Sequence, residues 1–300
     1  MTSTVMSSRE TALPRRPDGG RRSSGGARGL RFLPAHLLAW AYGVMLVIPI
    51  YYLVVSAFKS NIEIFSTPFA LPATFDLGNF TSAWDRARLG PALTSSLLIT
   101  AVSAVLTLAL SIPAAYGLAR ARGRLGTFVE RLFSLGFLIP GFAALIPTVL
   151  LAIELGLFQT RTFLIMFLPA TALPLSVILL TQFMRTVPPE LEEAATLDGA
   201  SRWKALRHVY LPIAMPGIAT VTILNLLSFW NEYLFTLILG GPDPRVRTIQ
   251  VALPTLISQT STEYGVLAAG TLVTLVPVYI AYILLSRQME DALTQGALKS

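Results

Sequence analysis

Six long apolar stretches constrain this chain more than any other feature of its sequence. They cover about residues 36–58, 92–119, 127–151, 162–184, 213–239 and 266–286. A helix needs about 20 mostly apolar residues to cross the hydrocarbon core of a bilayer, and each stretch reaches that length. Hydrophobic residues make up 53% of the chain and charged residues only 13%, roughly half the charged share of a soluble domain. These features argue against a soluble enzyme and predict an all-α membrane protein with six transmembrane helices.

Residues 1–31 form a separate region that is rich in arginine, serine, glycine and proline. This composition predicts a disordered basic tail. Such a tail could be an arm that binds nucleic acid, but beside six membrane spans a cytoplasmic tail near anionic lipid is the favoured interpretation. We therefore expect membrane lipid, and no nucleic acid, as its partner. The first apolar stretch is too long for the core of a signal peptide and is interpreted as a retained span.

The basic residues predict the orientation of the chain. Seventeen of the 23 Lys and Arg residues lie on the side of the tail and six lie on the other side. Cytoplasmic loops carry the excess of Lys and Arg in membrane proteins. We therefore expect a multi-pass protein of the plasma membrane with both termini in the cytoplasm. The same alternation places segments 59–91 and 240–265 outside the cell and segment 185–212 inside it.

The cytoplasmic segment 188–212 is much longer than a plain connection between helices. It reads PPELEEAATLDGASRWKALRHVYLP. The two prolines favour a helix start, and Gly199 interrupts the pattern before a second run with helical spacing. The sequence thus predicts two short amphipathic helices that meet at a glycine. From the residues alone, they could lie among lipid headgroups or form a docking element for a cytoplasmic partner.

A family resemblance favours the docking element. Glu193-Ala194-Ala195, then Gly199, then Leu211-Pro212 resembles the EAA signature of ABC-importer permeases, although Val209 stands where that signature has isoleucine. Asp198-Gly199-Ala200 resembles the carbohydrate, maltose-type branch of these permeases. The resemblance extends over about residues 34–300 and includes the C-terminal segment 292–299, which is similar to the second-subunit type.

The resemblance implies a six-span permease domain over residues 32–300 and a sugar importer driven by ATP. In that family the EAA helices fit a groove on a separate ATPase subunit. The resemblance therefore implies that this chain is coupled to its ATPase by a set of residues in segment 188–212. They are Glu193, Ala194, Ala195, Asp198, Gly199, Leu211 and Pro212.

The implied partners are a second permease subunit, two ATP-binding subunits, an extracytoplasmic sugar-binding protein and a mono- or oligosaccharide substrate. In the family, the region corresponding to 240–265 touches the binding protein, while a solvated connector is the alternative here. The chain has no GxxxxGK[ST] phosphate loop, so we expect a non-catalytic subunit whose partner hydrolyses ATP. It has no cysteine and no metal-ligand spacing, so we expect neither metal nor cofactor. A self-sufficient carrier or channel driven by an ion gradient is the alternative function.

Polar residues in the fifth apolar stretch are candidates for the translocation path. They are Asn225, Ser228, Asn231 and Glu232. Polar groups are costly inside a membrane and often mark a substrate pathway. The spacing of Asn225, Ser228 and Glu232 predicts that they share one helical face, and nearby aromatic rings suit the CH faces of a sugar. Hydrogen bonds between helices, beside an interfacial aromatic belt, are the alternative interpretation.

Overall fold

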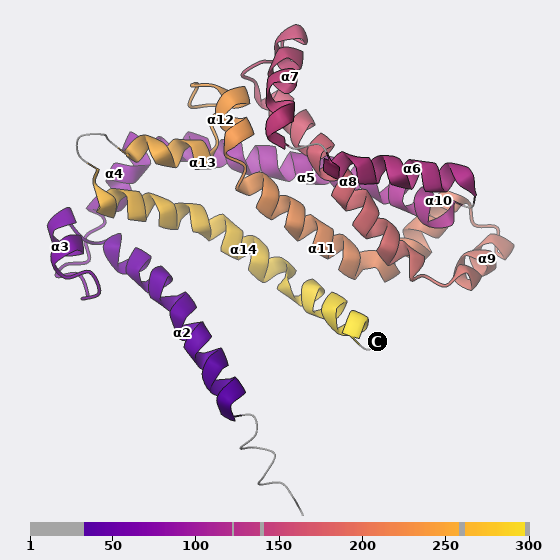
Figure 1. Ribbon diagram of the computed structural model, residues 1–300, viewed down its shortest axis with the longest axis horizontal. Helices are drawn as coiled ribbons and strands as arrows, with labels where there is room; N and C mark the ends of the chain where they lie inside the picture. The colour runs from indigo at the N-terminus through magenta and orange to yellow at the C-terminus, as the bar shows by residue number, and fades with distance from the viewer. Residues whose placement is uncertain (1–32, 122, 139–140, 258–261, 298–300) are drawn as a thin grey trace, which may run out of the picture. The chain divides into compact units, whose positions relative to one another are not determined.

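The structure is a computed structural model that describes residues 33–121, 123–138, 141–257 and 262–297. Within these residues all regular secondary structure is helical (Figure 1), which confirms the predicted all-α class. The predicted tail, residues 1–31, lies outside the described residues. The chain divides into two compact units, Met1–Ile50 and Tyr51–Ser300, and each is described by itself.

Five helices within the described residues are long and apolar enough to cross a membrane. They are His36–Ser56 in α2 (Leu33–Ser56), α5 (Leu89–Arg120), α8 (Arg161–Arg185), the continuous helix Arg202–Trp230, and Tyr264–Leu284 in α14 (Tyr264–Ala297). In the first unit, α2 exposes large apolar side chains such as Leu38 and Trp40. An apolar helix with such a surface suits contact with lipid.

The third predicted span, 127–151, is not one helix. It is divided among α6 (Arg124–Leu135), the short 3-10 helix η1 (Gly136–Leu138) and α7 (Gly141–Glu154). The division falls where the sequence has Gly136, Pro140 and Gly141, and both residue types disfavour a continuous helix. Gly136 also permits close packing, because a Cβ atom there would lie 2.6 Å from Cγ of Pro174 in α8.

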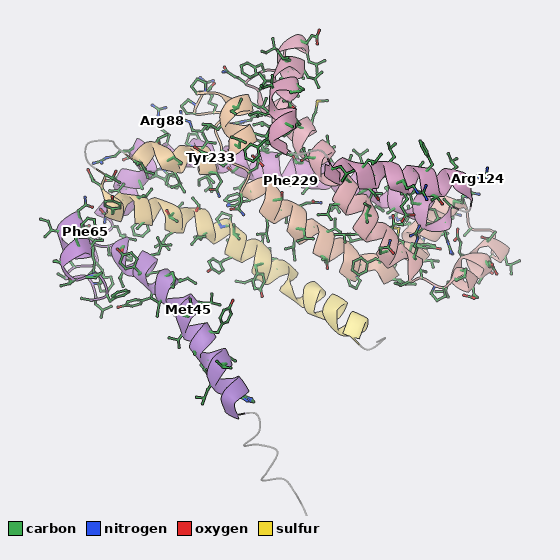
Figure 2. The ribbon with its side chains drawn as sticks, in the orientation of Figure 1. Met45, Phe65, Arg88, Arg124, Phe229 and Tyr233 are labelled. Atoms are coloured by element: carbon green, nitrogen blue, oxygen red, sulfur yellow. The ribbon has the colours of Figure 1, made fainter. Side chains whose placement is uncertain are left out.

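The fifth predicted span, 213–239, is also interrupted. The helix α11 (Leu211–Trp230) ends before Asn231, and α12 (Leu234–Gly240) begins after Tyr233. The Glu232 carboxylate accepts the backbone N–H of Phe235 at 2.9 Å and so satisfies a free donor in the first turn of α12. Figure 2 shows Phe229 and Tyr233 near this junction. Polar residues thus end one helix and begin another.

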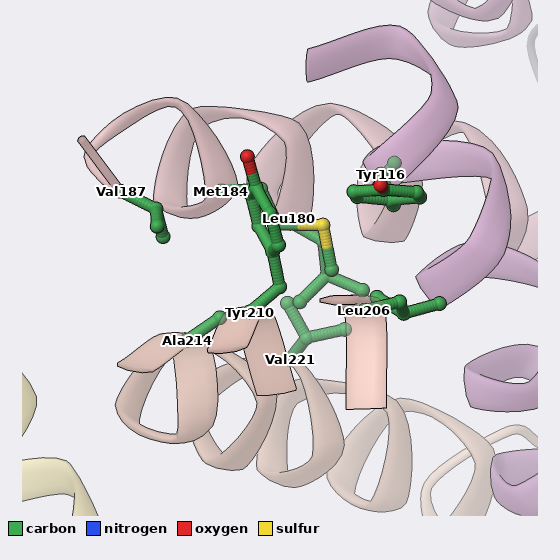
Figure 3. Packing of buried hydrophobic residues seen from close by; sticks show 9 residues of the cluster. Tyr116, Leu180, Met184, Val187, Leu206, Tyr210, Ala214 and Val221 are labelled. Carbon is green, nitrogen blue, oxygen red and sulfur yellow. The ribbon is translucent and has the colours of Figure 1, made fainter. Parts of the chain in front are cut away.

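The helices α5, α8 and α11 pack against one another and form the core of the second unit. One buried cluster joins Tyr116 of α5 to Leu180 and Met184 of α8 (Figure 3). The same cluster includes Tyr210, just before α11, and Val221 within α11. This cluster positions the end of α5 beside the predicted coupling segment.

The predicted external segments contain short helices that hydrogen bonds join to the core. They include α3 (Asn61–Ser66), α4 (Gly78–Arg86), α13 (Ile249–Ala252) and η3 (Leu253–Leu256). Ser95 of α5 donates to the carbonyl of Val246 at 2.9 Å, and Ser96 accepts the N–H of Ile249 at 2.8 Å. The segment before and at the start of α13 is therefore anchored to α5.

Close packing of α8 against α11 depends on Gly217. A Cβ atom at this position would lie 2.3 Å from Cγ of Phe183, so Gly217→Ala requires the helices to move. We expect a loss of about 1–3 kcal/mol in stability, as for other overpacked cores, measured as a lower thermal unfolding midpoint in nanodiscs. The control is Gly117→Ala in α5, where nothing lies within 4 Å. Equal midpoints for both variants would contradict the prediction.

Candidate functional site

The predicted coupling segment, 188–212, begins with α9 (Pro189–Leu197). Pro189 occupies the start of the helix, where its missing N–H is not needed. Glu190 and Glu192 lie in the first turn, where the helix dipole favours negative charge. None of the α9 residues is buried, so hydrophobic packing within the chain holds this helix only weakly.

Gly199 sets the bend that follows α9. Its φ is 78°, in the left-handed region that glycine adopts without steric strain. The N–H of Gly199 donates to the carbonyl of Thr196 at 3.0 Å, and that of Ala200 donates to the carbonyl of Ala195 at 2.9 Å. These two bonds form a Schellman motif, a common way to end a helix. The glycine bend predicted from the sequence is confirmed.

The second predicted amphipathic helix is not a separate element. Ser201 caps α10 (Arg202–Ala205) by accepting the N–H of Lys204, and the chain continues through η2 (Leu206–Tyr210), a π-helical turn, into α11. No helix-breaking residue lies between Ala205 and Leu211. The wide turn lies just before Pro212, which lacks a backbone donor. Most π-helical segments are single turns of this kind within a longer α-helix.

Most of the predicted coupling residues in and next to α9 are exposed on the surface of the chain. Glu193, Ala194, Leu197 and Asp198 are exposed, and we call these four residues the outer face of α9. The Leu197 side chain is 88% exposed. Beyond the bend, Trp203 is 65% exposed. The outer face is therefore accessible to a partner.

Glu192 lies on the other side of α9. Its carboxylate accepts hydrogen bonds from the hydroxyls of Tyr116, at 2.7 Å, and Tyr210, at 2.8 Å, and from Nε of Arg120. Burial raises the pKa of Glu192, but the bonds from Tyr116, Tyr210 and Arg120 lower that pKa by more, so its net pKa lies below the usual value. Glu192 is thus ionised at neutral pH and accepts three hydrogen bonds.

An open groove of about 830 Å³ lies beside this contact, at the end of α5 and along α9 and α10. Residues of all three elements line it, including Arg120, Glu193, Leu197 and Arg202. Charged and apolar groups thus meet in one open concavity. Such a surface suits a protein partner that presents both kinds of group.

The remaining coupling candidates lie elsewhere. Leu211 is half-buried and packs against the buried cluster of Figure 3, while Pro212 is exposed in the first turn of α11. The structure therefore does not bring Leu211 and Pro212 onto the outer face of α9. Their positions suit the transition from the segment into the membrane helix.

The candidates for the translocation path are not on one helical face. Asn225 is buried and its Nδ2 lies 3.1 Å from Oγ of Ser176, which joins α11 to α8. Ser228 is exposed. The prediction that Glu232 shares their face is wrong, because α11 ends at Trp230 and Glu232 instead caps α12.

Asn231 terminates α11 and contacts a third element. Its Nδ2 donates to the carbonyl of Leu227 at 2.8 Å, and its Oδ1 accepts from Gln250 of α13 at 3.2 Å. Asn231 and Glu232 thus lie at a helix break where polar groups are exposed or half-buried. Irregular backbone at membrane depth is tolerated where it is buried in protein or lines a cavity.

Sequence reasoning did not identify the partners of Glu192. Tyr116 and Arg120 are four residues apart, which places both side chains on one face of α5, near the basic end of a span. This pair of polar residues was the feature of the sequence that could have indicated a binding position for an acidic side chain. Tyr210 offered no comparable pattern, because only the tertiary fold brings it to Tyr116, with ring centroids 4.8 Å apart.

The fold and this site define a class of protein, namely a helical membrane protein with an accessible polar element just before one of its membrane helices. Comparison with known proteins then identifies the family. The family described as "Binding-protein-dependent transport system inner membrane component" matches residues 107–288. The chain belongs to this family, and is therefore a multi-pass inner-membrane permease.

Curated relatives match over most of their length. The diacetylchitobiose uptake system permease protein NgcG of Streptomyces coelicolor is 33% identical over 88% of each chain. The melibiose/raffinose/stachyose import permease protein MelC of Bacillus subtilis is 31% identical over 84% of this chain and 91% of its own. Because these relatives are permease subunits, the chain is a non-catalytic component and a partner hydrolyses ATP.

The fold is shared with a solved transporter. A crystal structure of a bacterial ABC transporter involved in the import of the acidic polysaccharide alginate matches with a TM-score of 0.75. The match covers 92% of this chain and 99% of that chain at 22% identity. This likeness supports the permease fold.

Proposed function

We propose that this chain is the permease subunit of an ATP-driven, binding-protein-dependent sugar importer. The observation that carries the proposal is the match, along 88% of the chain, to a relative named for diacetylchitobiose uptake. A second relative is named for import of melibiose, raffinose and stachyose. The substrate class is therefore a mono- or oligosaccharide.

The proposed assembly contains a second permease subunit, two ATP-binding subunits and an extracytoplasmic sugar-binding protein. Both termini lie in the cytoplasm, on the side with the excess of Lys and Arg. In this orientation α9 meets the ATPase, and the segment 240–265 meets the binding protein. The anchoring of that segment to Ser95 and Ser96 supports a role beyond that of a loose connector.

Coupling to the ATPase runs through segment 188–212. The exposure of Glu193, Ala194, Leu197 and Asp198 supports this role, since no other part of the second unit covers the outer face of α9 in the described residues. Ala195 and Gly199 hold the turn beside it. Leu211 and Pro212 join the segment to α11.

Reconstitution tests the proposed function. The purified chain, its sister permease, the ATPase and the binding protein are placed in proteoliposomes, and uptake of labelled diacetylchitobiose, melibiose and raffinose is measured. We expect uptake of at least one sugar that requires both ATP and the binding protein. Uptake driven by a sodium or proton gradient without ATP would support the carrier alternative and overturn the proposal.

We propose that Ser228, Asn231 and Glu232 line the translocation path, and that Asn225, the fourth candidate, contributes by holding α11 against α8. Asn225 lies within the contact between α8 and α11, and the others lie at or near the end of α11. The break at 231–233 supports this assignment, because two side chains there carry polar groups at the end of a membrane helix.

Two substitutions separate the possible roles of Glu232. Glu232→Gln keeps an acceptor for the Phe235 N–H but removes the charge, whereas Glu232→Ala removes both. If the carboxylate acts in the path, we expect both variants to lower uptake roughly tenfold, the effect of losing about 1.4 kcal/mol. Uptake kinetics at equal protein levels provide the measurement. Loss in Glu232→Ala alone would assign Glu232 to helix capping and contradict the path role.

A further inference from the structure

The attachment of α9 to the rest of the chain depends on a polar cluster. Because α9 contains no buried residue, apolar packing contributes little to holding it. Glu192 instead receives donors from two other elements, which are Tyr116 and Arg120 of α5 and Tyr210 of η2. We call these four residues the Glu192 cluster.

The donors are themselves packed together. The rings of Tyr116 and Tyr210 meet edge to face with centroids 4.8 Å apart, and Cζ of Arg120 lies 5.1 Å from the centroid of the Tyr210 ring. Edge-to-face aromatic pairs and cations above aromatic rings are both favourable. Tyr210 is fully buried, so the packing around its ring fixes the position of the hydroxyl that donates to Glu192.

We propose that Glu192 is a positioning residue that makes α9 move as one body with α5 and the start of α11. This inference rests on the proposed function, in which a partner ATPase pushes on the outer face of α9. Charge-assisted hydrogen bonds are shorter and stronger than neutral ones. Three of them, on a helix with no buried residue, transmit displacement of α9 directly to two membrane helices.

The turn at Gly199 cannot provide the same connection. It joins α9 to α10 through the two backbone hydrogen bonds of the Schellman motif and a left-handed residue. A glycine turn has little resistance to rotation of the backbone. Without the Glu192 cluster, displacement of α9 would therefore bend the turn instead of moving α5 and α11.

The first test uses the full chain alone in nanodiscs. Glu192→Gln keeps the size of the side chain but removes the charge, and the matched control is Glu190→Gln, which removes an equal charge from an exposed position in the same helix. We expect hydrogen exchange of the α9 amides to rise about tenfold or more in Glu192→Gln, which corresponds to 1.4 kcal/mol, and to stay unchanged in the control. Unchanged exchange in Glu192→Gln would overturn the proposal.

The second test uses the assembled importer and measures uptake per ATP hydrolysed. We expect Glu192→Gln and the double variant Tyr116→Phe/Tyr210→Phe to retain the ATPase and hydrolyse ATP, but to lose about tenfold in uptake per ATP. The same ratio in these variants and in wild type would overturn the proposal. Failure of the wild-type chain to bind an ATPase would count against the proposed function, while the exchange result would still decide the role of Glu192.

A covalent link between α5 and α9 tests whether α9 is attached rigidly to α5 or moves relative to it. The chain has no native cysteine, so Tyr116→Cys/Glu192→Cys can be bridged with a bifunctional thiol reagent in a complex whose other subunits also lack cysteine. We expect the bridge to restore uptake per ATP, and a monofunctional reagent to leave it low. A bridge that blocks uptake, with recovery when a cleavable bridge is cut, would show that α9 must move relative to α5 and would overturn the proposal.

Discussion

Replacing Gly199 with valine should lower uptake at least about tenfold while the protein still inserts into the membrane. The left-handed conformation costs about 1–2 kcal/mol for a residue with a side chain, and 1.4 kcal/mol is a factor of ten. No atom lies within 4 Å of a Cβ built at Gly199, whose φ is 78°. The loss therefore arises from the backbone conformation and not from a steric clash.

Two controls isolate the proposed coupling role of this turn. Gly156, at the end of α7, has a φ of 67° and equally open surroundings, and it also donates within a Schellman motif. Gly156→Val therefore carries the same backbone strain outside the coupling segment and should retain most of the uptake. Gly199→Asn should also retain much of it, since asparagine tolerates this conformation. Equal losses in Gly199→Val and Gly156→Val would contradict a specific role for Gly199.

Charge on the outer face of α9 should detach the proposed ATPase. Transfer of a leucine side chain out of water is worth about 1.5–3 kcal/mol, and a buried unpaired carboxylate adds a further cost. We therefore expect Leu197→Glu to reduce the ATPase that co-purifies with the chain at least tenfold. Trp203→Glu should have a similar effect if the interface extends past the bend.

The matched control for Leu197→Glu is Leu71→Glu. Leu71 is also a strongly exposed leucine, at 69%, but it lies in the predicted external segment 59–91. This variant should bind the ATPase as the wild type does. Normal co-purification of the ATPase with Leu197→Glu would show that the outer face of α9 is not the docking surface.

The membrane fold could be predicted from the sequence because hydrophobic length is a local property. Twenty apolar residues in one run are enough to specify a membrane helix, and five such helices are present in the described residues. The interruptions within predicted spans three and five were harder to predict. Proline and glycine are tolerated inside membrane helices, so Gly136 and Pro140 alone did not show that 127–151 is divided.

The candidate site also has features that could be predicted from the sequence and features that could not. The glycine turn and the start of α9 follow from residues next to one another in sequence, since Pro189 and Gly199 each impose a local backbone preference. The face shared by Asn225 and Glu232 could not be predicted, because helical spacing assumes an unbroken helix. The Glu232 carboxylate instead begins α12.

The sequence by itself determined the all-helical membrane class, the family and the bend after α9, because apolar length, a spaced motif and a left-handed glycine are read from neighbouring residues. Only the tertiary structure decided which acidic residue of α9 is exposed and which is held by the chain. Glu192 and Glu193 are adjacent and chemically identical, yet Glu193 is exposed while Glu192 meets Tyr116, Arg120 and Tyr210. These donors lie 76, 72 and 18 residues away in the chain, and only packing of α5 against the start of α11 brings them together.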